Sequence, residues 1–348
     1  MHILSFGCKK KDSTMNIKKS LLKATLAATV LASGISAKDY SGAELYTNDT
    51  FQYGKFEARM MMASGSGLVG SMFLYHNDSY MGGDEPWVEI DMEVLGKNTS
   101  QWQSNIITGK AGAQVTSEKK HAINPSASES YHTYGIEWTP SYVTWTIDGS
   151  VVRKTMTDSS DTKAQVQALV RAQGLRFNLW SSEESAWVGS FDDSMLPVHQ
   201  FISWVKVYSY TPGAGENGSD FTLDWTDNFE SFDGSRWGCG NWTFDGNRVD
   251  MNPDNINIVD GTMVISLTKA GEEGFYGTVP MDSEDISPEP QNGVTPADSS
   301  PEAEPIDPQG IRPARASAPN TVKKQSTFDA KGARVGNSHR RFQINFRH

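Results

Sequence analysis

The chain has 348 residues, of which 21% are charged and 10% aromatic, enough for one large domain or two ordinary ones. Its net charge of −11 is unevenly placed: residues 1–37 carry +5 and residues 311–348 carry +8, so that residues 38–310 carry −24. An acidic body argues against nucleic acid as its partner. All ten Trp lie between Trp87 and Trp242, which locates the folded, functional part.

Residues 1–37 are expected to be a leader that contains a secretory signal peptide. From Met15, which we take as the true start, a basic patch precedes a short Ala-rich apolar run and small residues before Lys38. The run is too short for a good membrane span, so no transmembrane segment is expected in the mature chain. The mature protein is therefore expected to be secreted, either extracellular or periplasmic. Cys239 is then its only cysteine, which leaves no internal disulfide.

Between Lys38 and Pro280 short alternating runs are separated by Gly, Asn, Asp and Pro. The strand-like runs are residues 54–63, 67–76, 88–96, 103–110, 132–140, 142–154, 174–182 and 201–210. Hairpin turns are expected at residues 139–142 and 148–150. Only residues 159–173 look helical, with Val166, Leu169 and Val170 on one face. About a dozen short strands predict an all-β, antiparallel sandwich or barrel.

The composition changes after residue 280. Residues 281–320 hold eight Pro, eight acidic residues and no aromatic residue, which is typical of a disordered, solvated linker. Residues 321–348 form a short basic segment in which Phe342, Ile344 and Phe346 alternate. We expect this segment to engage a secretion or surface-attachment partner that holds the protein at the cell surface; a weak single strand and an inert tail are the alternatives.

Three carboxylates share one face of the expected strand 88–96. Glu89, Asp91 and Glu93 alternate with apolar residues. Adjacent like charges cost about 0.2–1 kcal/mol per pair, so this face needs either solvent or a function. A solvated edge and a calcium site are two explanations, although calcium loops usually interleave Gly and Asn. The third is acid–base chemistry on a sugar, which requires two carboxyl groups about 5–5.5 Å apart. On an extended strand the Cα atoms of Glu89 and Glu93 lie about 13 Å apart, so their side chains must converge.

Candidate sugar-binding side chains alternate along two other strands. They are Phe73, Tyr75 and Asn77 on one strand, Arg176, Asn178 and Trp180 on another, with Gln103 and Trp187 as further candidates. Aromatic rings offer flat apolar surfaces to sugars, and the polar groups between them can bind hydroxyls. This alternation beside the carboxylate strand indicates a cleft rather than a core.

At these residues the chain resembles the bacterial lichenases of glycoside hydrolase family 16, over residues 38–280. The matching segments are residues 87–98, 103–112, 132–140, 174–182 and 204–213, in that order. The resemblance implies a jelly-roll β-sandwich of the concanavalin A-like kind, with its substrate cleft on the concave face. It implies retaining endo-hydrolysis of β-1,3-1,4-glucan, with Glu89 as nucleophile, Asp91 as its assistant, Glu93 as general acid and base, and no cofactor for catalysis. A β-1,3-glucanase on the same fold and a lectin-like module remain alternatives.

The order of the segments resembles the circularly permuted lichenases. Residues 220–268 look like the opening strands of an ordinary lichenase but here follow the carboxylate strand, and residues 332–348 resemble the basic C-terminal segment of the permuted type. Glu44 and Trp237 resemble substrate-contacting residues of that type. Relatives bind a structural calcium away from the cleft, and the resemblance assigns this site to Ser203, Asn228 and Gly261. Ser203 stands where relatives have Asn or Asp, a better ligand.

Overall fold

The computed structural model describes residues 37–159 and 164–282. The expected signal peptide, nearly all of the Pro-rich linker and the basic C-terminal segment lie outside the described residues. Within the described ranges, no helix is long and apolar enough to cross a membrane.

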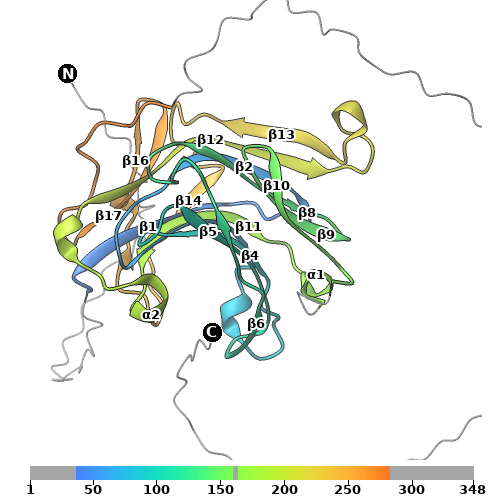
Figure 1. The fold of residues 1–348 in the computed structure, drawn as a ribbon, viewed down its shortest axis with the longest axis horizontal. Coiled ribbons are helices and arrows are strands. Elements are labelled where there is room, and N and C mark those ends of the chain that lie inside the picture. The colour runs from blue at the N-terminus through green and yellow to red at the C-terminus, as the bar shows by residue number, and fades with distance from the viewer. Residues whose placement is uncertain (1–36, 160–163, 283–348) are drawn as a thin grey trace, which may run out of the picture. The chain divides into compact units, whose positions relative to one another are not determined.

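The described residues form a two-layered β-sandwich of the jelly-roll type (Figure 1). The inner sheet has the order β14–β1–β11–β3–β4–β5, and both β6 and β7 pair with β5. Its strands are β1 (Tyr40–Thr47), β3 (Leu68–Tyr75), β4 (Glu89–Leu95), β5 (Gln101–Lys110), β6 (Ala113–Thr116), β7 (Lys119–Ala122), β11 (Gly174–Ser181) and β14 (Trp237–Cys239). The predicted fold class is confirmed.

The outer sheet runs β13–β12–β2–β8–β9–β10, and β12 also pairs with β17, which in turn pairs with β16. Its strands are β2 (Gly54–Met61), β8 (His132–Trp138), β9 (Tyr142–Ile147), β10 (Ser150–Met156), β12 (Val198–Tyr210), β13 (Phe221–Asp227), β16 (Ile256–Val259) and β17 (Thr262–Lys269). The two-residue β15 (Asp250–Met251) joins β1 in the one parallel pairing among the described strands. Short helical turns fill the connections: η1 (Ser79–Met81), α1 (Gln165–Ala168), α2 (Ser185–Val188), η3 (Asp193–Met195), η4 (Glu216–Gly218) and η5 (Pro253–Asn255).

Strand alternation determines which side chains enter the core. On β4, Ile90, Met92 and Val94 are buried in the main hydrophobic cluster, where the two sheets face each other. Trp138 and Trp145 enter the same cluster from β8 and β9 of the outer sheet. Because successive side chains of a strand point to opposite faces, the polar members of the inner-sheet strands are displayed on its other side.

The eight strand-like runs and both predicted hairpin turns are confirmed, but the helix expected over residues 159–173 is wrong. Only the single turn α1 forms, and residues 160–163 lie outside the described residues. Val166 and Leu169 are buried as expected, whereas Val170 is 54% exposed because the helix has already ended before it. One buried turn therefore accounts for the apolar pattern.

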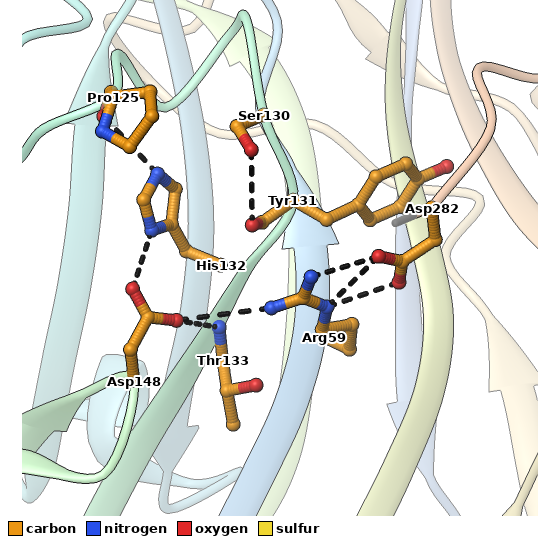
Figure 2. A network of polar contacts seen from close by, with 8 residues as sticks. All are labelled: Arg59, Pro125, Ser130, Tyr131, His132, Thr133, Asp148 and Asp282. Atoms are coloured by element: carbon orange, nitrogen blue, oxygen red, sulfur yellow. Dashed lines mark hydrogen bonds and ion pairs between the residues drawn. The ribbon is translucent and has the colours of Figure 1, made fainter. Parts of the chain in front are cut away.

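The folded body extends past the predicted boundary at residue 280. Asp282 is only 3% exposed, and both its carboxylate oxygens accept hydrogen bonds from the guanidinium of Arg59 on β2, at 2.7–3.2 Å. Figure 2 shows that Arg59 also faces Asp148, whose carboxylate bonds His132. This buried ion pair ties the last described residue to the middle of the outer sheet.

Candidate active site

The three predicted catalytic carboxylates lie together on the exposed side of the inner sheet, here called the carboxylate face. Glu89 and Glu93 are half-buried on β4, and Asp91 between them is buried. The indole nitrogen of Trp87 donates a hydrogen bond of 2.6 Å to Glu89, and that of Trp145 donates one of 2.9 Å to the backbone carbonyl of Asp91. The central strand is therefore fixed from both sides.

The strands that flank β4 bring predicted sugar-binding residues beside the carboxylates. On β3, Tyr75 is the register partner of Glu89 and Phe73 that of Asp91. On β5, Gln103 is the register partner of Glu93. Cross-strand partners on one face have neighbouring side chains, so the aromatic and amide groups border the carboxylates directly.

Strands β11 and β1 continue the carboxylate face with a buried ion pair. Arg176 on β11 donates a short hydrogen bond to Glu44 on β1 and a second, of 2.6 Å, to the side-chain oxygen of Asn77. The amide of Asn178 donates to the other Glu44 oxygen at 3.5 Å and accepts a 2.5 Å bond from the hydroxyl of Ser71. Four of the predicted residues thus form one polar network in a fixed geometry.

Aromatic rings border this network. The guanidinium of Arg176 lies 5.2 Å from the ring of Tyr75, 5.3 Å from that of Tyr46 and 5.8 Å from that of Trp242. Farther along β11, the ring of Trp180 lies 5.9 Å from Trp187 of α2. The predicted Trp180 and Trp187 therefore meet at one end of the carboxylate face.

The prediction of a substrate contact for Trp237 is wrong. Its side chain is only 2% exposed, packs on Phe177 and Phe229, and donates a hydrogen bond to Asp227 at 2.8 Å, all within the core. Trp242, five residues later, is 37% exposed and packs on Tyr46 at 5.5 Å. Both tryptophans lie in a Gly-rich stretch without alternation, so the sequence pattern gave no means of telling them apart.

Other residues of the carboxylate face escaped the sequence-based selection. They are Tyr46, Trp87, Asn105, Trp242 and Phe244. Asn105 and Tyr46 could have been predicted from the sequence. Each lies two positions after a predicted residue of the same strand, Gln103 and Glu44 respectively, and so shares its face. Phe244 lies outside the strands, and its ring reaches Trp180 at 5.1 Å only through tertiary packing.

Burial sets the protonation of the three carboxyls. Desolvation, followed by the charges of Glu89 and Glu118, raises the pKa of Glu93 to about 8. Desolvation also raises the pKa of Glu89 to about 7, although hydrogen bonds from Trp87 and Asp91 oppose the rise. The pKa of Asp91 lies well above its ordinary value because of desolvation and both neighbouring charges. The bond between Asp91 and Glu89 favours a proton on Asp91 and a charge on Glu89.

This arrangement suits double displacement at an acetal centre. One carboxyl remains protonated at neutral pH and can donate to a leaving oxygen, while a second ionises more readily and can attack. Aromatic rings and a rigid polar network lie on the same face, where a sugar chain could be held.

The three residues predicted to hold a metal lie away from this face, at the outer sheet. Ser203 sits at the irregularity of β12 between Ile202 and Trp204, and Asn228 follows the last residue of β13. The carbonyl oxygen of Asn228 lies 3.9 Å from the position that a side chain on Gly261 would take. Backbone carbonyl oxygens are among the ligands that calcium accepts, and the carbonyl of Asn228 near Gly261 is one such oxygen. Within the described ranges, no group of three or more His, Cys, Asp or Glu could hold a metal.

A separate small cavity lies at the other end of β1. Its lining includes Thr47, Asp49, Trp225, Asp233 and Arg236. Arg236 is paired with Asp227 at 2.8 Å, and Asp233 accepts hydrogen bonds from Ser235. Arg236 also lies 3.8 Å from Asp233, so these two charged lining residues face each other in the cavity.

Sequence comparison identifies relatives of the chain. The profile of the glycosyl hydrolases family 16 matches residues 5–196. A β-glucanase of Fibrobacter succinogenes is 54% identical over 364 residues, which cover 96% of this chain and 100% of that protein. A β-glucanase of Brevibacillus brevis is 35% identical over 185 residues, or 53% of this chain and 65% of that protein. Among solved structures, the β-glucanase of Bacillus licheniformis is 30% identical with a TM-score of 0.40, covering 48% of this chain and 70% of that one.

Proposed function

Because the chain belongs to glycosyl hydrolases family 16 and is a glycoside hydrolase of the β-glucanase kind, we propose that it is a secreted, retaining endo-hydrolase of mixed-linkage β-1,3-1,4-glucan. One observation carries the mechanism: Glu89, Asp91 and Glu93 share one desolvated face, on which burial holds the pKa of Glu93 near 8 and that of Glu89 near 7. Two neighbouring carboxyls are thus kept in different protonation states.

In the first step, Glu93 donates its proton to the glycosidic oxygen while the Glu89 carboxylate attacks the anomeric carbon. The bond to the leaving sugar breaks, and an ester forms between Glu89 and the remaining glucan. In the second step, Glu93 removes a proton from water, which attacks the same carbon and breaks the ester. Two inversions give net retention. Asp91, holding a proton toward Glu89, limits the charge on the face and lowers the pKa of the nucleophile.

The residues around the carboxylates have binding roles. Tyr75, Trp180 and Trp242 offer ring faces to the sugars. The Arg176–Glu44 pair with Asn77 and Asn178 supplies fixed donors and acceptors for hydroxyls. Gln103 is the clearest case: it is buried beside Glu93, and its amide has no partner among the described residues, so a sugar hydroxyl would satisfy it.

Product analysis tests the proposal. Purified full-length protein is incubated with barley β-glucan, laminarin and carboxymethyl-cellulose, and the products are separated by size. Short oligosaccharides from barley glucan alone are expected. Strong cleavage of laminarin would assign the site to a β-1,3-glucanase. Binding of glucan without any product would assign it to a lectin-like module, which the complete carboxylate trio disfavours.

We also propose a circularly permuted chain order, which the adjacent ends of the folded body permit. β1, at the start of the body, pairs with β17 near its end: Tyr40 faces Lys269 and Ser41 faces Thr268. Adjacent ends allow a chain to be reconnected without changing the sandwich.

We further propose a structural calcium held by Ser203, Asn228 and Gly261, tested by whether EDTA lowers Tm and calcium restores it.

Secretion is proposed on the basis of the signal-like segment that ends at Ala37, and the basic residues 321–348 are proposed to engage a secretion or surface partner. The first proposal is tested by the N-terminal sequence of the exported protein, which is expected to begin at Lys38. The second is tested by comparing the cell-bound fractions of the full chain and of a chain that ends at residue 320.

A further inference from the structure

The segment between β3 and β4 extends the carboxylate face beyond Glu89. The backbone amide of His76 donates to the carbonyl of Val88 at 3.0 Å, so the strand pairing that joins Tyr75 to Glu89 leads directly into this connection. The connection contains η1, drawn in cyan beside β6 in Figure 1. It therefore leads directly into β4, the strand that carries the three carboxylates.

The connection is held rigidly from within. Ser79 is fully buried; its hydroxyl accepts a hydrogen bond of 3.0 Å from the amide of Val88 and donates one of 3.3 Å to the carbonyl of Pro86. Glu85 accepts bonds from His76 at 2.9 Å and from Arg171 at 2.8 Å, which links the connection to the segment before β11.

The neighbouring β5–β6 turn supports the connection from the other side. The amide of Trp87 donates to the carbonyl of Gly109 at 2.8 Å, and Lys110 pairs with Asp84 at 3.2 Å. A connection fixed at so many points presents its exposed side chains in defined positions.

Two large apolar side chains are exposed on this rigid support. Tyr80 is 66% and Met81 65% exposed, although the residue before them is fully buried. The backbone of Tyr80 lies near the phenol group of Tyr75, whose ring borders Trp87 and whose register partner is Glu89. The exposed pair therefore lies next to the aromatic rings that adjoin the proposed nucleophile.

We propose that Tyr80 and Met81 form an accessory sugar-binding site, which holds a glucan chain where it passes beyond Glu89. The inference rests on the proposed function. It adds that these two residues make the enzyme bind long glucan chains better than short ones. A tyrosine ring offers a flat apolar face with a polar tip, and the methionine thioether adapts to irregular apolar surfaces. Such a site acts on polymer binding and leaves the chemical step unchanged.

A polysaccharide fits this surface better than a protein does. A stable protein interface buries about 800 Å² on each partner, far more than two side chains supply. Tyr80 and Met81 are instead continuous with aromatic residues already assigned to sugar binding. Successive sugars of one chain can pack on such a row of side chains.

The test compares Tyr80→Ala, Tyr80→Trp and the double variant Tyr80→Ala/Met81→Ala with the wild type. Tyr276→Ala is the matched control, because Tyr276 is 87% exposed and its hydroxyl donates a hydrogen bond to the nearby Glu273 carbonyl, at 3.4 Å. KM and kcat are measured on barley β-glucan and on a short aryl β-glucan oligosaccharide. Retention of each variant in a native gel containing barley β-glucan is measured in parallel, in the Glu93→Gln background.

Tyr80→Ala is expected to raise KM for the polymer about 3- to 10-fold and to weaken retention, with kcat and the short-substrate kinetics unchanged. Tyr80→Trp is expected to keep wild-type values, and the double variant to exceed the single one. Unchanged polymer KM and retention in Tyr80→Ala would overturn the inference, as would an equal loss of kcat on both substrates.

Failure of the proposed function has a different signature. A wild type that releases no products from any glucan refutes the hydrolase, whereas the gel still reports on the accessory site. Even without hydrolysis, weaker retention of Tyr80→Ala than of Tyr276→Ala in the glucan gel supports the accessory site. Equal retention of the two variants refutes the accessory site.

Discussion

Gln103 lies directly across the strand pair from Glu93, and its buried amide finds no hydrogen-bond partner among the described residues. An unsatisfied buried amide costs free energy that a bound hydroxyl can recover. We expect Gln103→Ala to lower kcat/KM on barley β-glucan about 10-fold, which corresponds to about 1–2 kcal/mol. Gln167→Ala, on the exposed side of α1, serves as control and is expected to be silent. Equal values for the two variants would remove Gln103 from the substrate site.

The pH dependence of kcat/KM follows from the two raised pKa values. Glu89 must be ionised and Glu93 protonated, so activity falls below pH about 7 as Glu89 gains a proton and above pH about 8 as Glu93 loses one. The expected profile is a narrow bell whose limbs belong to the interacting carboxyls as a group. Glu118→Gln removes a negative charge that raises the pKa of Glu93, so its alkaline limb is expected to move to lower pH. An alkaline limb that stays in place would contradict this assignment.

Trp237 and Trp242 are expected to respond oppositely to substitution. Trp237→Phe removes a buried hydrogen bond to Asp227 and leaves a gap in the core, so it should lower the free energy of unfolding by about 1–3 kcal/mol and leave KM unchanged. Trp242→Ala removes an exposed ring beside Arg176 and should raise KM with little loss of stability. Urea unfolding and steady-state kinetics on the same preparations separate the two effects. A raised KM in Trp237→Phe without lost stability would restore the original prediction.

The buried pair Arg59–Asp282 is expected to stabilise the domain without affecting catalysis. Asp282→Asn removes a carboxylate that pairs at 2.7 Å with the buried Arg59 guanidinium, which also faces Asp148 at 3.8 Å, and should cost about 2 kcal/mol or more in unfolding free energy. Asp193→Asn breaks a solvent-exposed pair with Lys269 and should cost clearly less, because solvent screens such a pair. Equal unfolding midpoints for the two variants would show that residue 282 is not part of the folded unit.

The sandwich was predictable because its signal is local. Strict alternation, as in residues 88–96, reports burial of one strand face whatever the neighbouring strands are, and the same alternation placed Glu89, Asp91 and Glu93 together. The pairing of β1 with β11 and β14 joins residues more than a hundred positions apart, and no local pattern specifies it. Family resemblance therefore gave Glu44 as a substrate-contacting residue, but nothing in the sequence placed it beside Arg176.

The errors arose where local pattern and tertiary packing differ. The apolar spacing of residues 159–173 indicated a helix, but one buried turn with Val166 and Leu169 satisfies it. The composition of residues 281–320 indicated a solvated linker, and it gave no sign that Asp282 would meet Arg59, 223 positions away. In each case the deciding contact comes from a distant part of the chain.

Azide rescue tests most directly the roles of Glu89 and Glu93. Each residue is replaced by Ala, and the variants are incubated with an activated aryl β-glucan oligosaccharide and azide. Azide can replace the missing nucleophile in Glu89→Ala, with one inversion, and should give an α-glycosyl azide. In Glu93→Ala azide attacks the ester on Glu89, with a second inversion, and should give a β-glycosyl azide. Nuclear magnetic resonance of the products distinguishes the two anomers; wild-type hydrolysis by Glu89→Ala, or the reverse pair of anomers, would contradict the assignment.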